Sequence, residues 1–223
     1  MDRALGTARL TILLGSVELD LVGGNVPFWL KVAHTLFVCI LVPVYWRSYG
    51  PANFLWFSDI ALLVTLPALW LEDCFLASTQ AVSVGLLELL WLLDFVGRLA
   101  TGTHLVGISR YMFDSSIAYR LRALSLFHVW LPFLLLWLAW RLGYDWRGWP
   151  AQTVLALAVL LVCYFATAPS KNINWIFGPG DKPQRRIPSG WYLLLLMAFM
   201  TLCVYLPTHL LLEWLFPPCG SPP

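Results

Sequence analysis

Long apolar runs dominate this sequence, and charged or helix-breaking residues interrupt them at intervals. A run of about 20 apolar residues is long enough to cross a bilayer as a helix. Six such runs cover residues 28–46, 53–71, 74–97, 122–140, 151–168 and 191–214. The pattern therefore predicts an all-α, polytopic integral membrane protein, a helical bundle of about six transmembrane helices.

The composition is typical of a membrane protein and not of a soluble domain. Apolar residues make up 60% of the 223 residues and charged residues only 12%, whereas soluble domains carry about 25% charged residues. The formal net charge is +2, and the basic residues fall in loops instead of clustering on one face, as binding to nucleic-acid phosphates requires. We therefore expect membrane lipids, and no nucleic acid, as partners.

The runs predict one domain with two short flanking segments. Residues 27–216 are expected to form a single six-helix transmembrane domain, followed by a C-terminal tail at 217–223. Residues 1–26 are predicted to be an interfacial or flexible segment, because their apolar stretch is too short to span a bilayer and contains Glu18 and Asp20. Only Glu72 and Asp73 separate the second and third runs, so these two helices should pack as an antiparallel hairpin.

The basic residues predict an orientation. We call the face of the bundle that holds both chain termini side A and the opposite face side B. Nine of the 14 Lys and Arg residues fall on side B, among them Arg110 and Lys182, and five fall on side A. Because cytoplasmic loops are enriched in basic residues, we expect the loops carrying Arg110 and Lys182 in the cytoplasm of a multi-pass protein of a bacterial inner or cell membrane.

Five cysteines are scattered along the chain, at Cys39, Cys74, Cys163, Cys203 and Cys219. None has the CxxC or CxxH spacing of a metal or haem site, and an odd number cannot all pair within one chain. We interpret most of them as small apolar filling residues.

Ionisable side chains inside the predicted helices are the candidate functional residues, because a charge in hydrocarbon costs a few kcal/mol. They are Asp59, Glu88, Asp94, His34, His128 and His209. At about 1.5 Å per residue, Ser58 and His128 would both lie about 8–9 Å below side B. Asp94 and the pair Asn172 and Asn174 are close to the same side, so we expect one polar layer there.

Three segments of this layer resemble motifs of the YwaF-like integral membrane family. The segments are Phe57-Ser58-Asp59-Ile60-Ala61-Leu62-Leu63, then Ser125-Leu126-Phe127-His128, then Asn174-Trp175-Ile176-Phe177 followed by Lys182-Pro183. The family, which includes a transmembrane phospholipid acyltransferase, has a Leu-Cys-Asp-Leu-Ala-Leu-type motif, a Ser-His-Gly motif, and Asn-Tyr-Met before Lys-Pro, in this order. The chain departs from the family at Trp56, where the family has histidine, and at Val129, where it has glycine.

The resemblance implies acyl transfer on a lipid. In the family the cysteine carries the acyl group and the histidine is its base, and these positions are Ser58 and His128 in this chain. The distantly similar androgen-induced hydrolases of fatty-acid esters use threonine and histidine at comparable places, so a hydroxyl nucleophile fits. The implied activity is that of a membrane-embedded lipid acyl hydrolase or transacylase that uses a Ser/His dyad at the level of the lipid ester groups.

The chemistry of such a site assigns roles to its neighbours. A neutral histidine can take the proton of a serine hydroxyl near pH 7, while a carboxylate orients the imidazole and amides stabilise the oxyanion. Basic side chains near the headgroups can hold a phosphate. The candidate catalytic residues are therefore Ser58, His128, Asp59, Asp94 and Asn174, and the candidate substrate-binding residues are Asn172, Trp56, Arg98 and Lys182. No metal and no other cofactor is expected.

Other interpretations stay open. Ser58 and His128 are also compatible with structural hydrogen bonding between helices, and Asp94 with an ion pair to Arg98 one turn further along. Glu88 has no obvious partner in the sequence, which favours a small membrane transporter. His34 and His209 are predicted at equal depth near side A, as in a structural or redox subunit that holds haem, or a metal together with Glu72 or Asp73.

Overall fold

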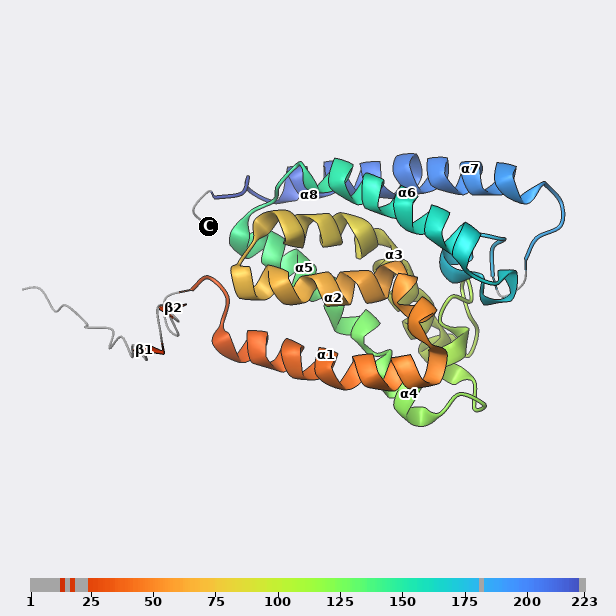
Figure 1. The fold of residues 1–223 in the computed structure, drawn as a ribbon, viewed down its shortest axis with the longest axis horizontal. Helices are drawn as coiled ribbons and strands as arrows, with labels where there is room; N and C mark the ends of the chain where they lie inside the picture. The colour runs from red at the N-terminus through yellow and green to blue at the C-terminus, as the bar shows by residue number, and fades with distance from the viewer. Residues whose placement is uncertain (1–12, 15–16, 19–23, 181–182, 221–223) are drawn as a thin grey trace, which may run out of the picture.

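The computed structural model describes residues 13–14, 17–18, 24–180 and 183–220. They form a helical bundle in which both ends of the described chain lie on side A (Figure 1). The α-helices are α1 Phe28–Tyr49, α2 Phe57–Leu71, α3 Cys74–Thr101, α4 Tyr119–Leu124, α5 Phe127–Leu142, α6 Gly148–Ala166, α7 Ser189–Phe199 and α8 Leu206–Leu215.

Short segments of other structure connect these helices. Four 3-10 turns lie near side B, namely η1 Pro51–Leu55, η2 Arg110–Phe113, η3 Pro169–Lys171 and η4 Ile173–Trp175, and the π-helical segment η5 Met200–Tyr205 joins α7 to α8. Within the described part of the predicted segment 1–26, β1 Leu13–Leu14 pairs with β2 Val17–Glu18 as a two-residue hairpin.

The prediction of an all-α membrane bundle is confirmed. Five helical stretches are long and apolar enough to cross a bilayer: α1, α3, α4 with α5 (Tyr119–Leu142), α6, and α7 through α8 (Ser189–Leu215). The predicted second span is shorter than expected, because residues 53–55 belong to η1 and the regular helix α2 has only 15 residues. At about 1.5 Å per residue α2 is about 22 Å long, less than the ~30 Å of a hydrocarbon core.

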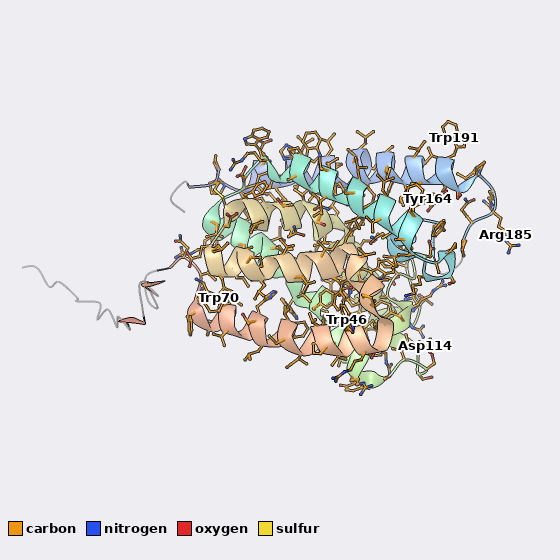
Figure 2. All side chains as sticks on the ribbon, in the orientation of Figure 1. Trp46, Trp70, Asp114, Tyr164, Arg185 and Trp191 are labelled. Atoms are coloured by element: carbon orange, nitrogen blue, oxygen red, sulfur yellow. A yellow bond between two sulfur atoms is a disulfide. The ribbon has the colours of Figure 1, made fainter. Side chains whose placement is uncertain are left out.

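The longest helix, α3, is the centre of the bundle. It packs against α2, α5, α6 and α8, and Figure 1 shows α1 at one edge and α7 with α8 at the opposite edge. Small side chains such as Ala77 and Ala81 are fully buried on α3 and let neighbouring helices approach closely. Figure 2 shows Trp70 near the side A end and Trp46 and Trp191 near the side B end, as interfacial tryptophans are placed in membrane proteins.

Glu72 organises the corner between α2 and α3, which form the predicted antiparallel hairpin. It ends α2 in the left-handed conformation (φ 51°) and accepts hydrogen bonds from the Asn25 N–H at 2.7 Å and from the Lys31 ammonium at 2.8 Å. Burial alone would raise the pKa of Glu72, but these bonds outweigh it and lower the pKa. The start of α1 is thereby tied to the α2–α3 corner.

A disulfide closes the same side of the bundle and corrects the interpretation of two cysteines as apolar filling residues. Cys74, the first residue of α3, is bonded to Cys219 in the C-terminal tail, 145 residues later. The tail is also held by backbone bonds from the Tyr144 N–H to the Pro217 carbonyl at 2.7 Å and from the Cys219 N–H to the Tyr144 carbonyl at 3.0 Å. Cys39, Cys163 and Cys203 are free.

Replacing Cys219 with serine is expected to lower the free energy of unfolding by about 2–4 kcal/mol, because the bond closes a long loop in the unfolded chain. Thermal unfolding of the detergent-solubilised protein, compared between the parent and Cys219→Ser, measures the loss. Cys203→Ser removes an exposed free cysteine and should unfold like the parent. A Cys219→Ser variant as stable as the parent would contradict a stabilising cross-link.

Candidate functional site

A buried cluster of ionisable side chains joins three helices of the bundle. His128 of α5 places its Nδ1 2.9 and 2.8 Å from the two carboxylate oxygens of Glu88 of α3, and Glu88 is only 3% exposed. The expectation that Glu88 has no partner is therefore wrong. An unpaired carboxylate inside the membrane was the observation that favoured a transporter. Because Glu88 is paired with His128, that observation no longer holds.

Two aromatic rings fix the plane of the His128 imidazole. The ring stacks on Phe127 with centroids 4.2 Å apart and on Trp91 with centroids 4.9 Å apart. When Glu88 is ionised, Nδ1 carries the imidazole proton and Nε2 is left as an acceptor. Nε2 makes no hydrogen bond to any residue that the structure describes, and the side chain keeps 14% exposure. The ring is thus held in one orientation with its basic nitrogen available.

Asp59 of α2 is the second carboxyl group of the cluster. It is 4% exposed and lies within electrostatic reach of both His128 and Glu88. Its Oδ2 accepts a hydrogen bond from the Asn53 amide at 3.0 Å, whereas its Oδ1 has no partner among the described atoms. The role predicted for Asp59, orienting His128, is taken by Glu88 instead.

Ser58 precedes Asp59 in the first turn of α2 and is half-buried. In the described chain no hydrogen bond joins its hydroxyl to His128 or to another group. Ser125 is a second serine of interest, because it precedes His128 by only three residues in the sequence. Its hydroxyl contacts the Tyr45 hydroxyl at 2.7 Å and donates a hydrogen bond to the Leu121 carbonyl at 3.0 Å. Ser125 belongs to the second of the three motif segments, where the resemblance assigns a role to His128 and none to Ser125.

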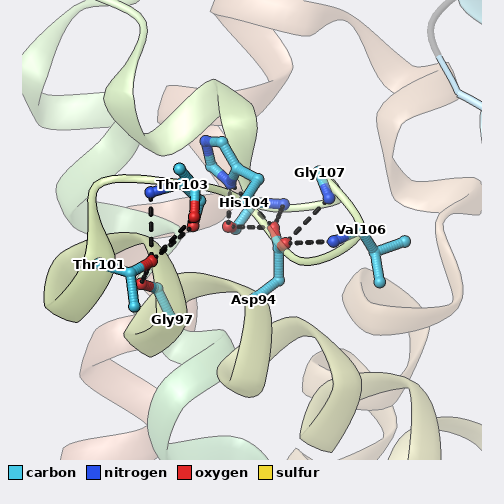
Figure 3. Close-up of polar contacts among 8 residues, drawn as sticks. Asp94, Gly97, Thr101, Thr103, His104, Val106 and Gly107 are labelled. Atoms are coloured by element: carbon cyan, nitrogen blue, oxygen red, sulfur yellow. Dashed lines mark hydrogen bonds and ion pairs between the residues drawn. The ribbon is translucent and has the colours of Figure 1, made fainter.

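Asp94 serves a loop and not the histidine. Its carboxylate accepts hydrogen bonds from the backbone N–H groups of Val106, Gly107 and Ser109 at 2.8–3.0 Å and from the Ser109 hydroxyl at 2.6 Å. The His104 ring lies 3.1 Å away on the same carboxylate (Figure 3). The predicted role of Asp94 beside His128 is therefore not supported, because all its bonds go to residues 104–109.

The predicted ion pair between Asp94 and Arg98 is also absent from the described residues. The Arg98 guanidinium lies over the Phe113 ring, 5.6 Å from its centroid. Arg98 therefore supports the 102–113 loop on side B through a cation–π contact.

Asn174, predicted as a catalytic residue, and Asn172, predicted as a substrate-binding residue, are both engaged by the backbone. Asn174 accepts from the Phe57 N–H at 3.1 Å and donates to the Leu55 carbonyl at 2.8 Å, which fixes the start of α2. Asn172 donates to the Gly178 and Gly180 carbonyls, both at 2.8 Å. Their amide donors are already used, so Asn174 positions the helix that carries Ser58, and Asn172 shapes its own loop.

A hollow of about 210 Å³ lies on side B beside this cluster. It is lined by Tyr49, Asn53, Trp56, Lys171 and Ile173. Trp56 was predicted as a substrate-binding residue, and Asn53 links the hollow to the buried Asp59. Lys171 supplies a positive charge at the same place. The predicted Lys182 lies outside the described residues.

His34 and His209 are far apart in the bundle. They belong to α1 and α8, which lie at opposite edges in Figure 1. His34 Nε2 contacts the Leu62 carbonyl at 3.0 Å, and His209 Nδ1 contacts the Tyr144 hydroxyl at 2.8 Å. This placement does not bring the two rings to one haem iron.

The alternative metal site also gains no support from the described part of the chain. The close group of metal-ligating atoms found there is Cys74, Asp145 and Cys219, whose two sulfur atoms form the disulfide. Neither histidine of the prediction belongs to it.

Comparisons with protein-family models, with curated proteins and with solved structures find no match to this chain. The geometry of the cluster and the three motif segments are therefore what a functional proposal has to rest on.

Replacing Asp94 with asparagine is expected to lower the free energy of unfolding by about 1–3 kcal/mol, since an amide cannot accept all the buried N–H bonds that end on this carboxylate. Hydrogen exchange of the peptide covering 102–110, followed by mass spectrometry, should rise with it. Asp114→Asn, at an exposed carboxylate of the neighbouring turn, is the matched control. Unchanged exchange in Asp94→Asn would refute this anchoring role.

Proposed function

We propose that this chain is a membrane-embedded lipid acyl hydrolase or transacylase with His128 as its general base. The observation that carries the proposal is the Glu88–His128 pair: a buried carboxylate holds Nδ1 and leaves Nε2 available. The same division of roles, in which a carboxylate fixes the tautomer and the other nitrogen takes a proton, operates in carboxylate–histidine–hydroxyl triads.

Ser58 is the proposed nucleophile. Its hydroxyl is not engaged by any other described group, and it sits in the first turn of α2, where the helix dipole favours developing negative charge. Its Oγ attacks the ester carbonyl carbon while the hydroxyl proton passes to His128 Nε2. The alcohol of the lipid then leaves with that proton, and an acyl-serine remains.

The second half of the reaction restores the serine. Water, in a hydrolase, or the hydroxyl of a second lipid, in a transacylase, attacks the acyl-serine after giving its proton to His128. The acyl group leaves as a fatty acid or as a new ester, and the proton returns to Ser58. The backbone N–H groups of Ser58 and Asp59 in the first turn of α2 lack intrahelical acceptors and replace the asparagine amides as candidate oxyanion donors.

The substrate would be a membrane lipid entering from the side B leaflet. The hollow beside Asn53 contains the amphipathic Trp56 ring and the Lys171 ammonium. These groups suit the headgroup region, where a cation can hold a lipid phosphate.

Reaction with a fluorophosphonate probe tests the nucleophile and its base. Ser58→Ala and His128→Ala are each expected to abolish labelling, and the double variant should lose no more, because nucleophile and base act as a unit. Glu88→Gln should slow labelling by on the order of 10³–10⁴-fold, since it no longer stabilises the imidazolium.

Ser48→Ala, at an exposed serine of α1, is the control and should label like the parent. Size-exclusion chromatography shows whether each variant is folded. Full labelling of folded Ser58→Ala would refute the assignment, and loss of labelling in Ser125→Ala alone would transfer the nucleophile to Ser125.

We propose a bacterial inner or cell membrane as the location, with side B in the cytoplasm. Two observations support this orientation. The sequence predicts nine of the 14 Lys and Arg residues on side B, and the Cys74–Cys219 disulfide lies on side A, where an oxidising compartment would keep it formed.

Labelling of single cysteines in intact cells tests the orientation, in a background without the free cysteines. A membrane-impermeant maleimide should react with Trp146→Cys on side A, and should react with Ser115→Cys on side B only after the cells are permeabilised. Both positions are exposed. The reverse pattern would invert the orientation.

A further inference from the structure

A column of aromatic rings extends from His128 toward the side B end of α3. Trp91 stacks on the His128 imidazole with centroids 4.9 Å apart, and Phe95, one turn further along α3, stacks on Trp91 at 5.0 Å. Phe113 of η2 lies next, with its centroid 5.5 Å from that of Phe95. The column therefore joins the buried histidine of the candidate site to the 102–113 loop through a continuous series of ring contacts.

The loop is fixed against α3 where it reaches the column. Asp94 of α3 is buried and accepts three backbone hydrogen bonds from the segment 106–109 (Figure 3). η2 follows this segment directly, and its Tyr111 ring lies 6.4 Å from that of Trp91, centroid to centroid. The loop thus brings two rings, those of Tyr111 and Phe113, against the rings of α3, and Asp94 keeps the loop in place.

The orientation of a catalytic imidazole needs more than one constraint. The hydrogen bond to Glu88 determines which nitrogen of His128 carries the proton, but a contact at one edge leaves the plane of the ring free to tilt. Phe127 and Trp91 stack on the imidazole with interplanar angles of 25° and 22°. These two rings do not contact each other in the part of the chain that the structure describes, so they lie on opposite faces of the imidazole and restrict its tilt.

Of the two flanking rings, that of Trp91 depends on support from the loop. It is 5% exposed, and its Nε1 has no hydrogen-bond partner among the described atoms, so packing alone holds the indole in its rotamer. Phe95 supplies the second stacked contact of the indole, and Phe113 supports Phe95 from η2. A change in the loop would therefore reach His128 through Trp91.

We propose that Trp91, Phe95 and Phe113 are positioning residues for His128, and that the 102–113 loop acts on the candidate site through them. A catalytic group has to be held within about 10–20° of its productive orientation, and the column fixes the plane in which Nε2 points. None of the three side chains is assigned a contact with the lipid. The inference rests on the proposed function, because it gives the loop a part in the reaction of the same base.

Nitrogen-15 NMR of the histidine-labelled full chain in nanodiscs measures this positioning without a substrate. The parent should show His128 as a single Nδ1–H tautomer, identified by the loss of its signals in His128→Ala. Phe113→Leu and Trp91→Leu should each give a mixture with the Nε2–H tautomer, because a loosened ring can also turn Nε2 toward Glu88. Trp91→Phe keeps a flat ring at the same place and should restore the single tautomer.

Two further variants separate positioning from general damage to the bundle. Phe133→Leu replaces a ring of α5 that is 53% exposed. It is the matched control and should leave the His128 signals unchanged. Phe113 is only half-buried, so Phe113→Leu decides the question even where Trp91→Leu fails to fold. Size-exclusion chromatography shows whether each variant is folded.

Reaction with the fluorophosphonate probe gives the functional readout. Phe113→Leu should slow labelling by about 2- to 10-fold, which corresponds to the loss of one aromatic pair, and Trp91→Leu by about 10- to 100-fold. If the parent does not label, the acyl proposal fails, while the tautomer measurement still tests the positioning. A single, unchanged His128 tautomer in folded Phe113→Leu would overturn the proposal.

Discussion

The absence of water inside a bilayer is the constraint on which the rest of this structure depends. Every polar group below the headgroups must find its partner within the bundle. Apart from Ser78 and Thr79, the buried side chains of the central helix α3 that carry polar atoms lie within an arc of about 140° at 100° per residue. They are Gln80, Ser83, Glu88, Trp91 and Asp94. A single stripe thus crosses the bundle from side A to side B, and the neighbouring helices are arranged around it.

The members of the stripe differ in how their polar atoms are paired. Asp94 organises a loop, since its five acceptor contacts fold residues 104–109 over the side B end of α3. Glu88 finds a titratable partner in His128. Between Glu88 and side A, the Gln80 carbonyl oxygen and the Ser83 hydroxyl have no partner among the described atoms. The stripe therefore includes the Asp94 anchor of the 104–109 loop and the buried Glu88–His128 pair.

The sequence was sufficient for the helices and insufficient for the pairing of their side chains. Apolar runs identify spans because the bilayer acts on each run separately, so the bundle was predictable.

The partner of Glu88 was not predictable, because the predicted helix at 122–140 placed His128 too close to side B. The helix begins at Tyr119 instead, with a bend at Ser125 and Leu126, which lowers His128 by about one turn to the level of Glu88. The roles of Asp94 and Asn174 were misjudged for a related reason: most of their partners are backbone groups, which no residue pattern reveals. The disulfide was missed because Cys74 and Cys219 lie 145 residues apart and no spacing rule covers such a pair.

The bond between Cys74 and Cys219 also constrains how this protein is made. Cys74 enters the membrane with α3, while Cys219 follows α8, the last helix. The bond from Cys74 at the start of α3 therefore cannot form until α8 has been inserted and the tail with Cys219 is on side A. Formation of the Cys74–Cys219 disulfide is consequently a late event in biogenesis. It can occur only after α8 has reached its place beside α3.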